Sequence, residues 1–216
     1  MNNEAKQFVH YVKDLANKYE VSLLFPQTST VKYSAIQRSS GYFMEESNRI
    51  VKATLACAMG NPHWLEILVH ESCHMQQWIA KSKLWTKCTF KGEDVNDVIE
   101  DWVERKVELT EAQLEYCIRK VQHVELDCEQ RSVEKIKEFN LPIDINKYIK
   151  QANAYIYSYA AIKKYRNLSN RFSYDSPALI GKMSKKFQSD VKMYQFIPRY
   201  AIKHYESIYK DERNEK

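Results

Sequence analysis

The chain has 216 residues, of which 44% are hydrophobic and 28% are charged, and its formal net charge is +5. This composition is that of a globular protein with a sizeable core, so it excludes disordered and fibrous classes. Only four Gly and five Pro occur, which favours long helices over an all-β fold with many tight turns. We therefore expect a single α+β, mainly helical domain over residues 1–216, with a helical C-terminal part at about 141–216.

Targeting signals and cysteine usage point to a cytoplasmic protein. The first residues contain no basic segment followed by an apolar run, and no stretch approaches the ~18 apolar residues of a membrane span. Five cysteines without a CxxC pair predict free thiols in a reducing compartment. Many basic residues lie after residue 140; they favour a solvated surface, with nucleic-acid contact as the weaker alternative. They are Lys147, Lys150, Lys163, Lys164, Arg166, Lys182, Lys185 and Lys186.

The first predicted elements are a helix and a small sheet. Residues 5–19 place apolar side chains at helical spacing, so they predict an amphipathic helix. Residues 20–60 contain short apolar and β-branched segments at 21–25 and 50–57, separated by turn-prone residues such as 39–41. This region is the candidate for a small sheet.

A helix is then predicted from Asn61 to about residue 80, because Asn accepts a bond from an orphan N–H and Pro62 suits the first helical position. On it, His70 and His74 are four residues apart, so both project from one face and both imidazoles can reach one zinc ion. Glu71 is then placed to contact a water on that ion without ligating it, which is the HExxH arrangement of metallopeptidases. The alternative is that both His are packed or solvated on an ordinary helix.

A zinc site of this kind needs a third protein ligand, and the second long helix, predicted at 110–139, offers one. Thr110 and Gln113 have capping-box spacing at its start. Glu125 lies on an otherwise apolar to weakly polar stripe, and a buried carboxylate requires a cation or another partner. Glu129, one turn later, is expected to support a ligating His. The alternatives are that Glu125 reaches the surface, or that Glu129 is the ligand. The stripe comprises Leu114, Ile118, Val121, Glu125, Cys128 and Ser132.

Other candidate ligands are weaker. His63 lies two turns before His70, about 10 Å along the axis, too far to join the same ion. His123 is expected to be solvated, and Cys73 to be a buried small residue. Helices are also expected at 144–166, 176–189 and 196–210. The first of these carries candidate oxyanion donors, although packing is the favoured reading of this cluster: Tyr155, Tyr157 and Tyr159.

The HExxH motif and the segment Glu125–Glu129 together resemble the gluzincin-type zincins, in which a downstream helix supplies a Glu ligand and a support residue four positions later. The small Cys128 before the support position is similar to the pattern of ImmA/IrrE-type peptidases. The segment Leu68–Trp78 resembles the corresponding segment of phage and bacterial metallopeptidases. The resemblance covers about residues 41–140, with 81–109 as an insertion. It implies a zincin-like fold with a small sheet on the HExxH helix, residues 50–58 being the strand that pairs with an extended substrate. The alternative is that these residues form a covered strand within the small sheet.

These features together predict a zinc peptidase with one Zn²⁺ ion, held by His70, His74 and Glu125, and a peptide or protein substrate. Glu71 would act as general base towards the attacking water and then protonate the leaving amine. Two alternatives remain open. One is a DNA-associated protease like the SprT-like zincins; the other is a non-catalytic zinc-binding interaction protein.

Overall fold

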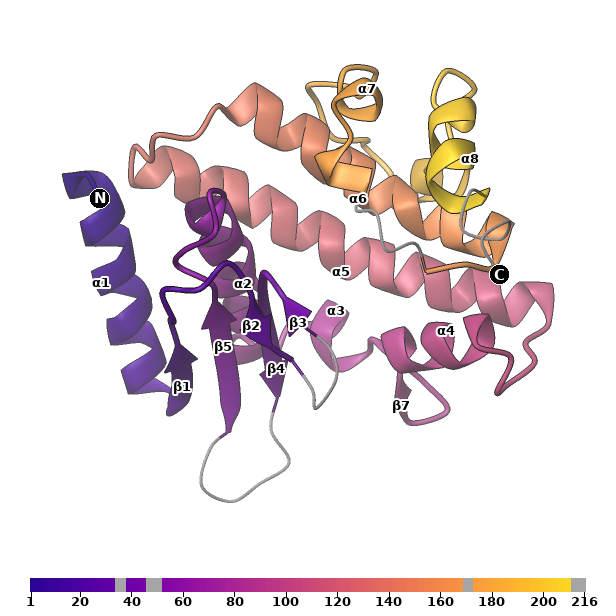
Figure 1. Ribbon diagram of the computed structural model, residues 1–216. Coiled ribbons are helices and arrows are strands. Elements are labelled where there is room, and N and C mark those ends of the chain that lie inside the picture. The colour runs from indigo at the N-terminus through magenta and orange to yellow at the C-terminus, as the bar shows by residue number, and fades with distance from the viewer. Residues whose placement is uncertain (34–37, 46–51, 169–172, 211–216) are drawn as a thin grey trace. The chain divides into compact units, whose positions relative to one another are not determined.

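The computed structural model describes residues 1–33, 38–45, 52–168 and 173–210. The fold is α+β and mainly helical, as predicted (Figure 1). The chain divides into two compact units that alternate along the sequence. Unit 1 comprises Met1–Ser82 and Gln130–Ile143; unit 2 comprises Lys83–Glu129 and Asp144–Lys216. The helical part expected at 141–216 therefore belongs mostly to unit 2, which also includes Lys83–Glu129.

Unit 1 contains the predicted N-terminal helix and small sheet. Helix α1 begins two residues earlier than predicted, because Asn2 caps it by accepting a hydrogen bond from the Ala5 amide at 3.0 Å. Its buried Phe8 packs edge-on against Phe139, with ring centroids 5.1 Å apart. The elements of this unit are α1 (Asn3–Lys18), β1 (Val21–Leu24), β2 (Val31–Lys32), β3 (Arg38–Ser39), β4 (Gly41–Glu45), β5 (Ala53–Cys57) and α2 (Trp64–Ile79).

The three-stranded sheet has the order β1-β5-β4, with β1 parallel and β4 antiparallel to β5. The predicted strand at 50–58 was thus wrongly placed at the substrate-pairing edge: β5 is the central strand and all five of its residues are buried. Residues 50 and 51 lie outside the described residues. The two edges are β1 and β4, and Gly41, predicted to be in a turn, is the first residue of β4.

Helix α2 begins at Trp64, three residues after the predicted start. Asn61 does not cap the helix; its Oδ1 accepts a hydrogen bond from the His63 amide at 2.8 Å, and its Nδ2 donates to the Ser29 carbonyl at 3.2 Å. The Asn-Pro pair therefore forms a turn that joins β5 to α2, because the asparagine side chain bonds locally instead of to the helix.

Helix α5 (Glu111–Glu138) matches the prediction closely, and among the described residues it is the one helix that contributes to both units. The capping box forms as expected: the Thr110 amide donates to Gln113 Oε1 at 2.9 Å, and the Gln113 amide donates to Thr110 Oγ1 at 3.3 Å. The helix ends before Asn140, which takes a left-handed conformation with φ of 50°.

Unit 2 packs α4, α6 and α8 with the first part of α5 around one apolar core. Helix α6 is confirmed, but the helices expected at 176–189 and 196–210 are much shorter. Helix α7 stops before Gly181, a poor helix former, and α8 begins only after Pro198. The elements are α3 (Lys83–Thr86), β6 (Thr89–Phe90), β7 (Glu93–Asp94), α4 (Val95–Val103), α6 (Ile145–Tyr165), η1 (Ser173–Asp175), α7 (Pro177–Ile180), η2 (Val191–Gln195) and α8 (Ile202–Lys210).

The described residues bear on two predicted features, the lack of a membrane-spanning helix and the state of the cysteines. Within the described ranges, no helix combines the length and the apolar character that crossing a membrane would require. All five cysteines are buried free thiols, as the sequence predicted.

Candidate metal centre

Helix α2 brings the two histidines of the motif together. The Nε2 atoms of His70 and His74 lie 3.2 Å apart, and the two rings are nearly perpendicular, with centroids 4.7 Å apart. Two imidazole nitrogens that bind one tetrahedral zinc at 2.0–2.1 Å are about 3.3–3.4 Å apart. The pair therefore fits a shared zinc ion.

His74 is held by a polar contact within the same helix. Its ring is 7% exposed, and its Nδ1 lies 2.8 Å from Oε1 of the buried Gln77. Gln77 is not among the residues predicted to belong to the site, although its place three residues after His74 puts both side chains on one face of the helix.

Glu71 lies where β4 and β5 meet α2. A Cβ atom added to Gly41 would be 3.3 Å from Cγ of Glu71, and Gly41 is the cross-strand partner of Cys57. Burial raises the pKa of the Cys57 thiol to about 12, and the negative charge of Glu71 adds to the shift. Both observations place the Glu71 carboxylate beside the paired ends of the two strands.

Glu125 faces the interior, so the alternative in which it reaches the surface is wrong. Every member of its stripe on α5 is buried, and Glu125 itself is 6% exposed. The Tyr155 hydroxyl donates to Oε1 of Glu125 at 3.3 Å, and it lies 2.9 Å from the Tyr159 hydroxyl. Tyr157, by contrast, accepts from the Gln188 side chain at 3.0 Å. The Tyr cluster thus separates into two hydroxyls beside Glu125 and one in the core.

Glu129 is also buried, at 5% exposure, one turn after Glu125 on the same helix. The roles of Glu125 as ligand and Glu129 as support remain predictions. Two buried carboxylates on one helix require cations or hydrogen-bond donors, and this requirement is consistent with either assignment.

The structure adds Cys128 to the candidates. Among the described residues, His70, His74 and Cys128 form a group that could hold a metal ion. The sequence predicts only a small residue at Cys128, although thiolate is a good zinc ligand. Its place three residues after Glu125 was the signal that could have identified it.

The weaker candidates behave as predicted. His63 bonds Glu66 Oε2 through Nδ1 at 2.9 Å, in the turn that starts α2. His123 is exposed, and Cys73 is fully buried between the two histidines of the motif. Neither His63 nor His123 belongs to the potential metal group.

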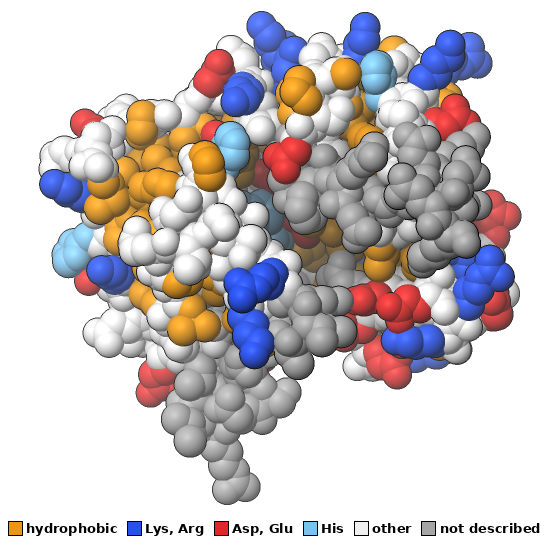
Figure 2. All heavy atoms as spheres, viewed as in Figure 1, with side chains coloured by type: hydrophobic (Ala, Val, Ile, Leu, Met, Phe, Trp, Pro, Cys, Tyr) orange, Lys and Arg blue, Asp and Glu red, His pale blue; other side chains and the backbone are white. Residues whose placement is uncertain are grey.

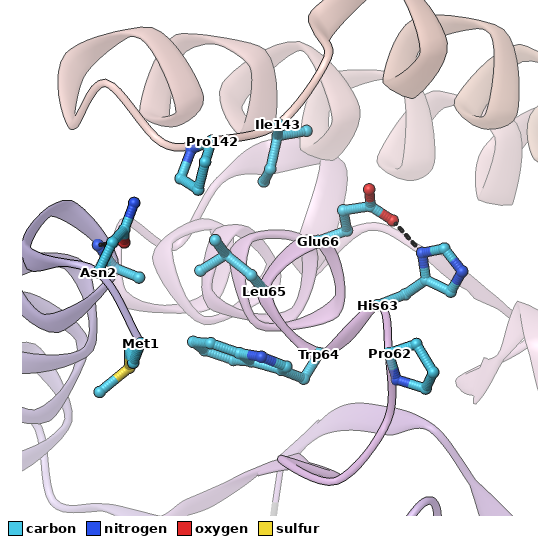
Figure 3. A pocket seen from close by; sticks show the side chains of 10 residues that line it. Met1, Asn2, Pro62, His63, Trp64, Leu65, Glu66, Pro142 and Ile143 are labelled. Carbon is cyan, nitrogen blue, oxygen red and sulfur yellow. Dashed lines mark hydrogen bonds and ion pairs between the residues drawn. The ribbon is translucent and has the colours of Figure 1, made fainter.

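A cavity of about 380 Å³ opens at the start of α2, within unit 1 (Figure 3). Its apolar side chains include Trp64, Leu65 and Ile143, and the His63–Glu66 pair lies at its edge. None of the HExxH residues lines it. This cavity is therefore separate from the candidate metal centre.

The basic residues give no added support to nucleic-acid binding on the face seen in Figure 2. There the Lys and Arg side chains occupy several separate places, with Asp and Glu side chains between them. A nucleic-acid site is usually a continuous basic patch or stripe. The nucleic-acid alternative thus remains supported only by composition.

Comparisons with known proteins return no relative. No protein-family model matches the chain, and searches of curated proteins and of solved structures find no significant match.

Proposed function

We propose that this protein is a zinc-dependent hydrolase of the zincin type, with peptides or proteins as substrates. The observation that carries the proposal is the 3.2 Å separation of the His70 and His74 Nε2 atoms, with Glu71 on the same helix. A bound zinc ion would supply a Lewis acid that lowers the pKa of water to about 7 and polarises the substrate carbonyl.

Glu71 is the proposed general base. It follows His70 directly, so its carboxylate can approach the ion's surroundings without occupying a ligand position. It would accept a proton from the attacking water and return that proton to the leaving amine. Strand β4 lies beside this side chain: a Cβ atom added to Gly41 would be 3.3 Å from its Cγ atom.

Helix α5 is the proposed source of the third ligand. Glu125 is our first candidate, because it is a buried carboxylate on the apolar stripe and Tyr155 donates a hydrogen bond to it. That bond would help to orient the carboxylate. Cys128 and Glu129 are the competing candidates on the same helix.

The edge strand β4 is an argument for a peptide as the substrate. The Ala58 amide donates to the Ser40 carbonyl at 2.9 Å, so the alternation of an antiparallel pair turns the backbone groups of Gly41 and Phe43 away from β5. An extended peptide can pair with such an edge as a further strand. We propose that β4, in place of the central β5, has this role.

The test combines metal analysis with hydrolysis of a peptide library. The wild-type protein should contain about one zinc per chain, and His70→Ala or His74→Ala should lose it, because the remaining ligands cannot complete the site. Glu71→Gln should keep the fold and the zinc but lose hydrolysis, since an amide cannot accept the proton. Unchanged zinc content in both His variants would refute the metal site, and metal loss in Glu71→Gln would make Glu71 a ligand. Zinc binding without cleavage of any peptide would instead favour the non-catalytic alternative.

A further inference from the structure

Gln77 is a fully buried polar side chain on the helix that carries the motif. It is 0% exposed and lies three residues after His74, so the two side chains share one face of α2. Its Oε1 is 2.8 Å from Nδ1 of His74. This distance is that of a good hydrogen bond in a buried setting, where such bonds are strongest.

The chemistry of this contact determines which nitrogen of His74 carries the proton. A carboxamide oxygen can only accept, so Nδ1 must donate, and in the neutral ring Nε2 then has its lone pair exposed for another partner. That lone pair belongs to the atom that lies 3.2 Å from Nε2 of His70. The proton is thus held on the side of the ring away from the histidine pair.

We propose that Gln77 is a positioning residue that fixes His74 in the Nδ1–H tautomer and orients its Nε2 for metal binding. The predicted effect of Gln77 on metal affinity rests on the proposed function, because it requires the zinc site. The predicted tautomer of His74 does not require that site. The functional motif is thereby extended from His70–His74 to Gln77. Polar partners of this kind raise the basicity of a ligating histidine and fix its ring.

The opposite orientation of the Gln77 amide would give a different tautomer of His74, and the two tautomers can be distinguished by measurement. If the Gln77 amide were turned by 180°, its Nε2 would donate to Nδ1, and the proton of His74 would move to Nε2. The ring would then present an N–H, not a lone pair, toward His70. The tautomer of His74 is therefore the direct readout of the proposal.

The first experiment is ¹⁵N NMR of imidazole resonances in the metal-free, full-length protein, at a pH where His74 is neutral. Wild type and the Gln77→Glu variant should show the Nδ1–H tautomer, since a carboxylate also accepts from Nδ1. Gln77→Leu should shift His74 toward the Nε2–H form or a mixture, because leucine offers no acceptor. An Nε2–H form in the wild type would overturn the proposal.

The second experiment is zinc titration of the same metal-stripped proteins. Gln77→Leu should weaken zinc binding about 10–100-fold, the usual cost of removing a support residue, and Gln77→Glu should restore it. Gln76→Leu is the matched control: it makes the same change one residue earlier, where the described residues include no hydrogen-bond partner for Nε2, and should leave affinity unchanged.

The outcomes separate this proposal from the proposed function. If wild type shows the Nδ1–H tautomer but binds no zinc, the hydrolase proposal fails and the tautomer assignment stands. If zinc binds equally well to wild type and to a folded Gln77→Leu variant, Gln77 has no positioning role. If Gln77→Leu does not fold, weak zinc binding by the folded Gln77→Glu variant would contradict the proposal, because that variant keeps the acceptor.

Discussion

Gly41 of β4 and Glu71 of α2 are close neighbours, with room for little more than one carbon atom between them. A Cβ atom on Gly41 would be 3.3 Å from Cγ of Glu71, and only 2.4 Å from Cγ2 of Ile67. Strand β4 therefore passes directly over the turn of α2 that carries the proposed general base. Position 41 therefore has room for glycine but not for a larger residue, because Ile67, Glu71 and the Ala56 carbonyl fill the space beside it.

The Gly41→Ala variant tests this relationship. The new Cβ would also lie 2.9 Å from the Ala56 carbonyl oxygen, and backbone in the sheet cannot move aside easily, so β4 must shift away from α2. We expect a loss of about 1–3 kcal/mol in the free energy of unfolding. We also expect a lower kcat at unchanged zinc content, measured by urea unfolding and peptide hydrolysis. Gly181→Ala is a control, because its Cβ would have no neighbour under 3.0 Å; equal losses in both variants would contradict the prediction.

The third ligand can be identified by zinc titration of metal-stripped α5 variants. Glu125→Ala should weaken binding far more than Glu129→Ala, because a direct ligand contributes more than its support, whose loss costs about 10–100-fold. Cys128→Ala decides whether the thiol of the His70–His74–Cys128 group binds instead. Cobalt substitution gives an independent readout, since a thiolate ligand adds a sulfur-to-metal charge-transfer band. If Glu129→Ala alone loses the metal, ligand and support must be exchanged.

Tyr155→Phe should weaken zinc binding without unfolding unit 2. Its hydroxyl donates to Glu125 Oε1 at 3.3 Å, and its removal leaves that carboxylate less firmly oriented. We expect a loss of affinity up to the roughly 10-fold that the removal of a weak support bond gives. Tyr157→Phe removes a hydroxyl from the same helix that bonds Gln188 instead, so it should cost stability but leave zinc affinity unchanged. Equal affinities in the two variants would remove Tyr155 from the site.

Arg166→Ala should destabilise unit 2 without affecting the metal. Arg166 donates from Nε to the Trp102 carbonyl at 2.9 Å and stacks over the Trp102 ring at 4.8 Å, so it joins the ends of α4 and α6. We expect a loss of about 1.5–3 kcal/mol in thermal or urea unfolding. Glu108→Gln removes only the exposed ion pair to the same guanidinium, which is worth about 0–1 kcal/mol. A larger loss in Glu108→Gln than in Arg166→Ala would be inconsistent with this account.

The sequence by itself determined what depends on spacing within one helix. The His70–His74 pair, the burial of Glu125 and the Thr110–Gln113 capping box all follow from 3.6 residues per turn, a property that any helix imposes on its own residues. These predictions were confirmed. The same spacing also predicts the zinc ion and the roles of Glu71, Glu125 and Glu129, and these remain predictions.

Only the tertiary structure decided what depends on contacts between elements. The sequence identified a strand near residues 50–57 but not its central place, because strand order is set by which neighbours bury it and not by its own residues. Likewise, the sequence predicts a turn at Gly41. Its neighbours in the chain do not reveal that a Cβ atom at this position would lie only 2.4 Å from Cγ2 of Ile67 on α2. Spacing places Cys128 on the stripe of Glu125, but only the structure groups its thiol with His70 and His74, because the spacing of residues along one helix does not say which residues of other elements face that helix.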